Sequence, residues 1–209
     1  MKRQPDHSRK ERHAVVKQKY DDVQSDGRYE EGMARMALYH HHCQDPVIFR
    51  ALGDVRGKSL LDLACGDGFY TRRFRTECGA DPVMGIDLSS KQIERAEAIE
   101  QQEPLGIDYR VGDVMELRLD RRFDVATAIH LLHYLENAGE IASTLSRIYD
   151  LLDDRGYFVT MIALTQSSTS TGTTHRIRRR SLATTSHWPS PAMVAYCAFT
   201  PGDLRKSES

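Results

Sequence analysis

The fold is decided by the stretch LLDLACGDG, residues 60–68, in which a short apolar run ends in a turn of small residues. An apolar run of this length before a Gly-rich turn is typical of a buried β-strand, and the spacing over 69–76 predicts a helix after the turn. Ala64, Gly66 and Gly68 have no bulky side chain, so the backbone of the turn can pass close to a ligand. The stretch therefore predicts a strand, a ligand-binding turn and a helix in succession.

Short β-rich runs and helical stretches alternate beyond this turn. Strands are predicted at residues 59–64, 82–86, 107–111, 123–129 and 157–164, and helices at 69–76, after 89 and at 141–152. Ser89 and Gln92 have the capping-box spacing at the start of the second helix. Such alternation implies right-handed crossovers and helices on both faces of a parallel sheet, which binds ligands at the carboxyl ends of its strands. We therefore expect an α/β fold with a doubly wound, mainly parallel, Rossmann-like sheet.

Two carboxylates follow the second and third predicted strands. Asp87 lies 21 residues beyond Gly66, where a carboxylate can accept both ribose hydroxyls of an adenosine. Asp113 lies beside the same crevice and suits the exocyclic amine of adenine. The two positions predict a nucleoside site at this edge of the sheet.

Five segments resemble the class I S-adenosylmethionine-dependent methyltransferases, in that family's usual order and spacing. They are LLDLACGDGFYTRRF (60–74), GIDLSSKQIERA (85–96), YRVGDV (109–114), FDVATAIHLLHYL (123–135) and LLDDRGYFVTMI (151–162). The resemblance covers residues 45–164 and implies S-adenosyl-L-methionine as cofactor and methyl transfer to N, O or C of a small-molecule acceptor. A nicotinamide-binding unit or a plain tight turn is the alternative. It is disfavoured because G-x-G-x-x-G requires a third glycine, which is absent after Gly68.

The resemblance also implies a set of cofactor-binding residues. Asp62, Ala64 and Gly66 look like the turn around the methionine part of the cofactor, although many members have Gly in place of Ala64. Asp87 resembles the ribose ligand, with Leu88 against the adenine. Asp113 and Val114 resemble contacts to the adenine edge, and Ile129 resembles the residue beneath the sulfonium. Within the family, the chain looks most like bacterial small-molecule methyltransferases, including N-methyltransferases of toxoflavin-type pathways.

Two histidines, His130 and His133, follow the fourth predicted strand, where an acceptor would meet the methyl group. Either is a candidate general base or substrate ligand, because imidazole titrates near neutrality; the alternative is an exposed helix surface. Residues 40–43, His-His-His-Cys, do not predict a metal site, because at most two of them share a helix face. The basic run 176–180 predicts a solvated segment rather than a phosphate site.

Charge and composition divide the chain into four parts. Residues 1–19 hold seven Lys or Arg against two acidic residues and predict a basic disordered leader. Residues 20–52 predict a helical cap over the site, with a fresh helix start at Asp45 before Pro46. Residues 53–164 are the expected cofactor-binding core, and 165–209 form a Ser/Thr-rich tail.

The tail departs from the family pattern, which normally continues with a helix and an antiparallel hairpin. Sixteen of its 45 residues are Ser or Thr, and its apolar run 192–199 lacks the alternation of a paired strand. We expect the sheet to lack its last two strands, which leaves 157–164 as an open edge, or the natural C-terminus to be replaced, for instance by a frameshift near codon 165. Two functions follow as alternatives: an active methyltransferase, and a truncated inactive remnant that only binds the cofactor or a partner.

The composition excludes several other classes. Of 209 residues, 40% are hydrophobic and 28% charged, near the globular average, and no apolar run approaches the ~20 residues of a membrane span. The four cysteines have neither zinc-site spacing nor the density of a disulfide scaffold, and the net charge of -1 creates no field that recruits nucleic acid. We expect a cytoplasmic protein with a small-molecule acceptor and neither a nucleic acid nor a membrane as partner. The oligomeric state does not follow from the sequence.

Overall fold

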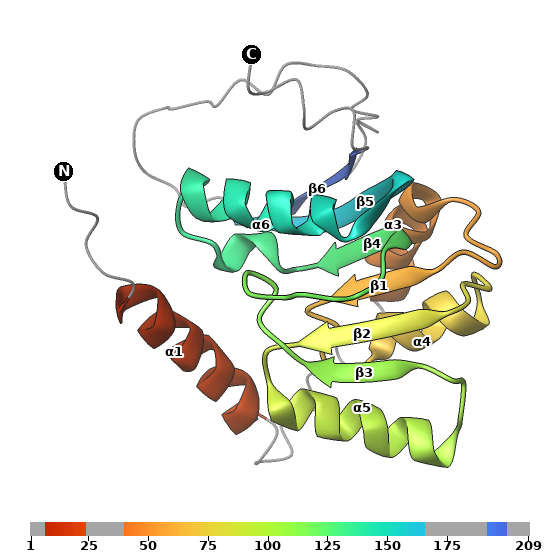
Figure 1. Ribbon diagram of the computed structural model, residues 1–209, viewed down its shortest axis with the longest axis horizontal. Coiled ribbons are helices and arrows are strands. Elements are labelled where there is room, and N and C mark those ends of the chain that lie inside the picture. Colours follow the sequence, from red (N-terminus) through yellow and green to blue (C-terminus); the bar gives the residue numbers. More distant parts are fainter. Residues whose placement is uncertain (1–6, 24–39, 166–191, 200–209) are drawn as a thin grey trace.

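Six strands form one sheet in the part of the chain that the structure describes, residues 7–23, 40–165 and 192–199. In the computed structural model their order is β3-β2-β1-β4-β5-β6 (Figure 1). The strands are β1 (Leu60–Leu63), β2 (Val83–Asp87), β3 (Asp108–Val111), β4 (Phe123–Ile129), β5 (Leu152–Thr165) and β6 (Ala192–Phe199). Strands β1 to β5 run parallel, so the predicted doubly wound parallel sheet is confirmed.

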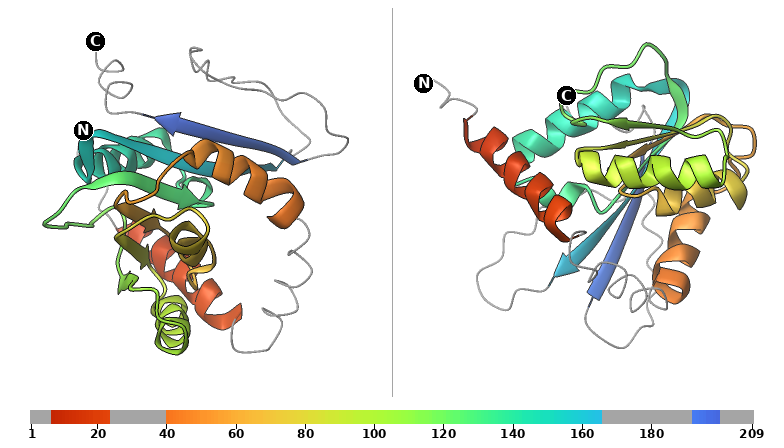
Figure 2. Two further views of the ribbon diagram at one scale, coloured as in Figure 1. Left: turned by 90° about the vertical axis from the view of Figure 1, so that its right-hand side faces the viewer. Right: turned by 90° about the horizontal axis from the view of Figure 1, so that it is seen from below.

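Helices cover both faces of the sheet (Figure 2). They are α1 (His7–Val23), the π-helix η1 (His40–Gln44), α3 (Asp45–Leu52), α4 (Phe69–Thr76), α5 (Ser90–Gln102), the 3-10 helix η2 (Leu132–Tyr134) and α6 (Ala138–Asp150). Helices α3, α4 and α5 contribute to the hydrophobic core on one face, and α6 contributes to the core on the other.

Strand β1 lies in the middle of these layers, and it carries apolar side chains on both of its faces. Leu60 packs into the core on the face of α3 to α5, whereas Leu61 and Leu63 pack into the core on the face of α6. All three are fully buried. Burial on both faces explains why the run is continuous instead of alternating, and each such leucine stabilises the fold by about 1.5–3 kcal/mol.

Local capping signals set the helix ends. The Ser89 hydroxyl accepts from the backbone N–H of Gln92 at 3.2 Å, which confirms the predicted start of α5. Helix α3 begins at Asp45 with a proline in its first turn, also as predicted. Helix α6 begins at Ala138 rather than 141, because the Asn137 side chain accepts from the backbone N–H at position 140 and starts the helix earlier.

Helix α1 corrects the prediction of a disordered leader over residues 1–19, since the chain is helical from His7 onward. Polar contacts hold this helix to the core: Arg12 pairs with Glu136 at 3.1 Å, and His13 lies 2.8 Å from Asp113. Helix prediction from periodicity depends on an apolar stripe, and α1 has none. For this reason the sequence pattern did not reveal it.

Strand β6 corrects the prediction of an open sheet edge. Residues 192–199 pair antiparallel with β5, in a register that runs from Phe158 opposite Phe199 to Thr165 opposite Ala192. Ladder hydrogen bonds join backbone groups and do not require alternating side chains, so a continuous apolar run is also compatible with a strand. The basic run 176–180 and the rest of the tail lie outside the described residues.

Tyr109, on β3, explains two of the glycines. Its ring lies against the turn after β1, so that a Cβ on Gly68 would overlap its hydroxyl, and a Cβ on Gly85 would lie 2.7 Å from its Cδ1 atom. Gly68 also has φ +85°, a left-handed conformation that disfavours side chains. The absence of a side chain at Gly68 therefore leaves room for the Tyr109 ring. The sequence analysis instead predicted that this glycine leaves room for a ligand.

Replacement of Gly68 by Ala should lower the free energy of unfolding by about 2–4 kcal/mol, from backbone strain together with the overlap with Tyr109. Gly106 is the matched control, because it has φ +76° and no atom lies within 4 Å of its ideal Cβ. Gly106→Ala should lower the free energy of unfolding by only about 1–2 kcal/mol, because it introduces backbone strain without an overlap. Urea unfolding of both variants measures the difference, and equal losses would contradict a constraint by Tyr109.

Candidate functional site

The carboxyl ends of the parallel strands meet at one edge of the sheet, and in Figure 1 the arrowheads of β1, β2 and β3 point toward α1. The chain runs from β1 outward to β3 and then returns to β4, on the other side of β1. The strand order therefore reverses between β1 and β4, and ligands of doubly wound sheets bind at such a reversal. The loops after β1 to β4 form the candidate site.

Backbone strain is concentrated at this reversal. Among the described residues, Ala64 and His130 are the two non-glycine residues with positive φ, at +57° and +64°. Ala64 directly follows β1, and His130 directly follows β4. Left-handed backbone at an L-residue costs about 1–2 kcal/mol and is enriched at functional sites. The strain is therefore an independent indication that the site lies here.

Asp87 connects the loops after β1 and β2. Its Oδ2 accepts from the backbone N–H of Gly66 at 2.9 Å, and its Oδ1 accepts from the backbone N–H of Ser89 at 2.9 Å. Burial raises the pKa of Asp87, and the backbone N–H donors oppose this change. The structure thus brings together Gly66 and Asp87, as predicted, with the half-buried Leu88 next to them.

Asp62 lies beneath the turn rather than in the crevice. It is 2% exposed, and both of its oxygens accept from hydroxyls: Thr71 of α4 at 2.6 Å and Thr127 of β4 at 2.7 Å. Burial raises the pKa of Asp62 to about 6, and the charge of Asp87 acts in the same direction. Its side chain therefore holds β1 to its two neighbours, a role that the sequence pattern did not reveal.

Asp113 follows β3 and lies at the same edge. Its Oδ1 accepts from the backbone N–H of Met115 at 2.9 Å, and its Oδ2 lies 2.8 Å from Nδ1 of His13. The side chain of Val114 is buried in the core on the α6 face, so its backbone is the part that can face a ligand. Ile129, at the end of β4, is buried in the core on the opposite face.

Helix α1 contacts the loops after β2, β3 and β4, which is the main feature of the site that the sequence did not predict. The contacts are polar: His13 to Asp113, Ser89 donating to Asp21, the Tyr20 hydroxyl to the Tyr134 hydroxyl, and Arg12 to Glu136 and Glu140. The Nζ of Lys91 also donates to the backbone carbonyl of Asp21 at 3.1 Å. The helix therefore covers the edge that carries Asp87 and Asp113.

The two predicted histidines differ in their surroundings. His130 lies 2.8 Å from the amide nitrogen of Gln44, a buried residue of η1. His133, on η2, is exposed and packs its ring 4.1 Å from the ring of Tyr134. Their ring centroids are 5.9 Å apart. The structure thus brings both to one loop, and it adds Gln44 from the N-terminal cap, which no sequence motif indicated.

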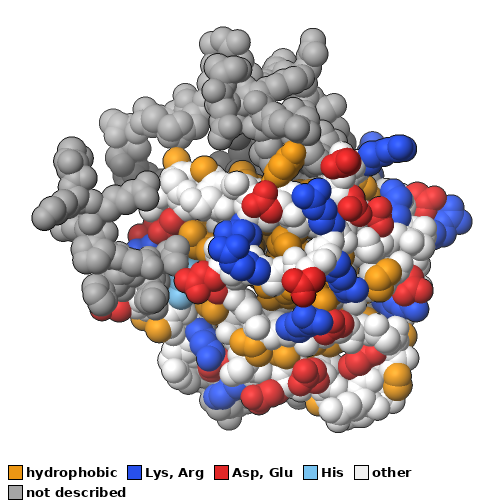
Figure 3. Space-filling model, in the orientation of Figure 1, with side chains coloured by type: hydrophobic (Ala, Val, Ile, Leu, Met, Phe, Trp, Pro, Cys, Tyr) orange, Lys and Arg blue, Asp and Glu red, His pale blue; other side chains and the backbone are white. Residues whose placement is uncertain are grey.

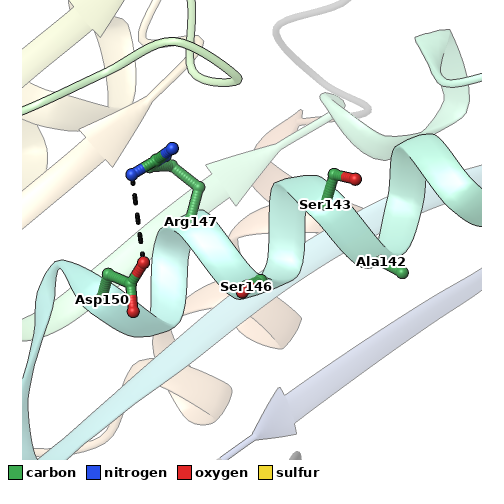
Figure 4. Close-up of a pocket in the computed structure, with 5 residues that line it drawn as sticks. All are labelled: Ala142, Ser143, Ser146, Arg147 and Asp150. Atoms are coloured by element: carbon green, nitrogen blue, oxygen red, sulfur yellow. Dashed lines mark ion pairs between the residues drawn. The ribbon is translucent and has the colours of Figure 1, made fainter.

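The described part of the chain also has a depression away from these loops, on α6. A depression on α6 is lined by Ala142, Ser143, Ser146, Arg147 and Asp150, where Arg147 pairs with Asp150 at 3.9 Å (Figure 4). It holds no candidate nucleophile with an adjacent base. Basic and acidic side chains are interspersed on the face shown in Figure 3. Within residues 7–23, 40–165 and 192–199, no helix is long and apolar enough to cross a membrane, and no cluster of three potential ligands could hold a metal ion.

The raised pKa of Asp62 predicts how stability changes with pH. Below about pH 4 the Asp62 carboxyl is protonated in both the folded and the unfolded protein. Between about pH 4 and 6 the unfolded chain loses this proton while the folded protein keeps it, so the free energy of unfolding falls as the pH rises. Relative to Asp62→Asn, the unmodified protein should lose about 2–3 kcal/mol of unfolding free energy between pH 4 and 6.5. Urea unfolding at several pH values measures this difference, with exposed Asp81→Asn as control. Parallel curves for the unmodified and Asp62→Asn proteins would contradict it.

The chain is similar to known methyltransferases over this core. Residues 60–156 match a family described as a methyltransferase domain. The ubiquinone biosynthesis O-methyltransferase of Nitrobacter winogradskyi is 33% identical over 90 residues, which cover 43% of this chain and 34% of that protein. The demethylmenaquinone methyltransferase of Lactococcus lactis is 27% identical over 147 residues, 69% of this chain and 56% of that protein.

A solved structure is also similar to this chain. The crystal structure of an S-adenosylmethionine-dependent methyltransferase from Mesorhizobium loti is 34% identical, with a TM-score of 0.50, over 56% of this chain and 52% of that chain. The chain spans between 34% and 56% of the length of the two curated relatives described above. The Mesorhizobium loti protein is named as dependent on S-adenosylmethionine. By the sheet, by the turn after β1 and by these matches, residues 60–156 form a domain of the class I S-adenosylmethionine-dependent methyltransferase family.

Proposed function

We propose that this chain binds S-adenosyl-L-methionine at the carboxyl ends of β1 to β3 and transfers its methyl group to N, O or C of a small-molecule acceptor. The observation that carries the proposal is the hydrogen bond from Gly66 to Asp87, which fixes a glycine turn and a carboxylate side by side at the reversal of the sheet. Both residues lie within the stretch 60–156 that matches a methyltransferase domain.

The residues fit this cofactor by their chemistry. The Asp87 carboxylate accepts from the backbone N–H groups of Gly66 and Ser89, and the backbone N–H of Leu88 also interacts with it. A carboxylate has about four lone-pair sites, so it retains the capacity to accept from a ribose hydroxyl. Asp113 offers an acceptor for the adenine amine, and Leu88 offers apolar surface beside it. At Gly66 the nearest atom to an ideal Cβ is the Gln92 Oε1 atom at 3.8 Å, and the missing side chain leaves the backbone accessible. Ala64 completes the small-residue turn, and Ile129 ends the adjacent strand.

The chemistry needs little from the protein beyond positioning. When bound, S-adenosyl-L-methionine supplies a methyl group that its sulfonium already activates. The chain then has to hold an acceptor atom in line with that group and exclude water, and such positioning is worth about 7–11 kcal/mol. Helix α1 and residues 40–52 flank the crevice and suit this exclusion. A base is needed only where the acceptor atom must first lose a proton, and His130 and His133 are the candidates near it.

The acceptor is proposed only as a class. One relative is named as a demethylmenaquinone methyltransferase and another as a ubiquinone biosynthesis O-methyltransferase, so a small organic acceptor fits better than a nucleic acid. The net charge of -1 also favours a small organic acceptor over a nucleic acid. The second candidate is a remnant that binds the cofactor without turnover, favoured by the atypical composition of residues 165–209. A screen of small acceptors with labelled S-adenosylmethionine, run beside calorimetry with S-adenosylhomocysteine, separates the two. Binding without any turnover would favour the remnant.

Replacement of Asp87 by Ala should weaken S-adenosylhomocysteine binding by about 1.5–3 kcal/mol, because the ribose hydroxyls lose a charged acceptor. Calorimetry measures this change, and thermal unfolding of the same variant monitors the turn that Asp87 also fixes. The control is Asp108→Ala on β3, a partly exposed carboxylate whose partner is Arg110 at 2.7 Å. Unchanged affinity in Asp87→Ala would remove this residue from the proposed site.

Replacement of His133 by Ala should lower the transfer rate by about 10²–10⁴-fold if this side chain acts as the base, and should remove the pH dependence of the rate near neutrality. The measurement uses an acceptor found in the screen. Exposed His41 on η1 provides the control substitution to Ala. A fully active His133→Ala protein would assign His133 a structural role.

A further inference from the structure

Helix α1 is docked on the edge of the sheet by a face that is almost wholly polar. Residues 11, 14, 15 and 18 are exposed, whereas 12, 13, 16, 17, 20 and 21 are half-buried, which is the periodicity of one helix face. Among the residues of α1 whose burial the structure describes, Val16 is the one aliphatic member of the half-buried set. A helix that packs permanently on a core normally buries an apolar stripe. The polar face therefore needs its own explanation.

On one side of the reversal of the sheet, this face contacts groups next to the proposed cofactor. The hydroxyl of Ser89 donates to Asp21, and the backbone N–H of the same serine donates to Asp87, the proposed ribose acceptor. His13 lies 2.8 Å from Asp113, which follows β3. The helix therefore lies over the loops after β2 and β3, where the adenosine is proposed to bind.

On the other side of the reversal, the same face contacts the loop after β4 and the start of α6. Arg12 pairs with Glu136 at 3.1 Å and also contacts Glu140. The hydroxyls of Tyr20 and Tyr134 contact each other. The helix thus bridges the loops after β3 and β4, and a ligand between these loops lies beneath it. Contacts on both sides have to break before such a ligand can enter or leave.

These contacts are of a kind that forms and breaks easily. The side chain of Arg12 is 29% exposed and that of Glu136 is 57% exposed, so solvent and salt screen their attraction. Undocking exposes little apolar surface, because the contact face is polar, and water can replace the hydrogen-bond partners of that face. The sheet, in contrast, is held together by buried leucines such as those of β1.

We propose that α1 is a gate that undocks from the loops after β2, β3 and β4 to let the cofactor enter and leave, and that docks again over the bound cofactor. The inference rests on the proposed function, because that function places the cofactor beneath the helix. The ion pair of Arg12 with Glu136 lies on the β4 side, away from the proposed adenosine contacts on β2 and β3. It can therefore be changed to alter the gate without removing a cofactor contact.

A charge reversal at this ion pair tests the gate. Arg12→Glu places a carboxylate opposite Glu136 and Glu140, so the association and release rates of S-adenosylhomocysteine should both rise by about 3–30-fold. The double variant Arg12→Glu/Glu136→Arg brings opposite charges together again and should return both rates toward those of the unmodified protein. Val15→Glu is the control, because Val15 is 69% exposed, and it should leave both rates unchanged. Surface plasmon resonance on the full chain measures the rates.

Salt should act with opposite sign on two of these proteins. S-adenosylhomocysteine carries one ammonium and one carboxylate, so its net charge is zero near neutral pH and salt has little direct effect on it. An increase in ionic strength from about 0.05 to 1 M shortens the Debye length and should speed release from the unmodified protein, where Arg12 is attracted to the glutamates. The same increase should slow release from Arg12→Glu, where the charges repel.

The outcomes separate the gate from the proposed function. Equal rates in the unmodified protein and Arg12→Glu would overturn the gate, as would a rise of the release rate alone, which indicates a lost contact with the bound cofactor. No binding of S-adenosylhomocysteine by the unmodified protein would overturn the proposed function and the gate with it.

Hydrogen exchange of the α1 amides tests the docking without a ligand. Exchange should be faster in Arg12→Glu than in the unmodified protein, and the double variant should restore the slower exchange. Unchanged exchange in Arg12→Glu would show that these charges do not hold the helix, and would overturn the gate even if the cofactor binds.

Discussion

The buried carboxylate of Asp62 is the interaction on which the rest of the site depends. An ionised group in the core is unfavourable by several kcal/mol unless donors surround it, and here the hydroxyls of Thr71 and Thr127 supply them. These donors come from the helix after the turn and from the neighbouring strand, so the turn is held in place from both directions. With the turn fixed, Gly66 reaches Asp87, whose other oxygen fixes the loop into α5.

Helix α1, which covers the edge of the sheet that carries the candidate site, is held by other interactions than those that hold the core together. Helix α1 contacts the edge through partly exposed polar groups such as His13 with Asp113 and Arg12 with Glu136. Contacts of this kind contribute about 0–1 kcal/mol each, whereas each core leucine of β1 contributes more. Helix α1 therefore separates from the edge of the sheet at a lower free energy than the sheet unfolds, which suits the proposed binding of a cofactor and an acceptor at this edge.

Most of the core could be predicted from the sequence because its causes are local. The start of α5 follows from Ser89 and the backbone N–H three residues later, and the strands follow from apolar runs such as 60–63 and 123–129. The edge of the sheet that carries the site follows from the alternation of strands and helices. Helix α1 and strand β6 could not be predicted, because the helix is held by polar side chains and the strand pairs through backbone groups.

The sequence by itself therefore determined the class of fold, the order of its elements and the turn that is proposed to approach the cofactor. Only the tertiary structure decided what surrounds that turn. Gln44 and His130 are 86 residues apart, and His13 and Asp113 are 100 apart, so no spacing rule connects them. Tyr109 likewise reaches the turn from the edge of the sheet and accounts for a glycine that the motif assigns to a ligand. Such contacts depend on how the layers pack, and packing joins residues regardless of their separation in the chain.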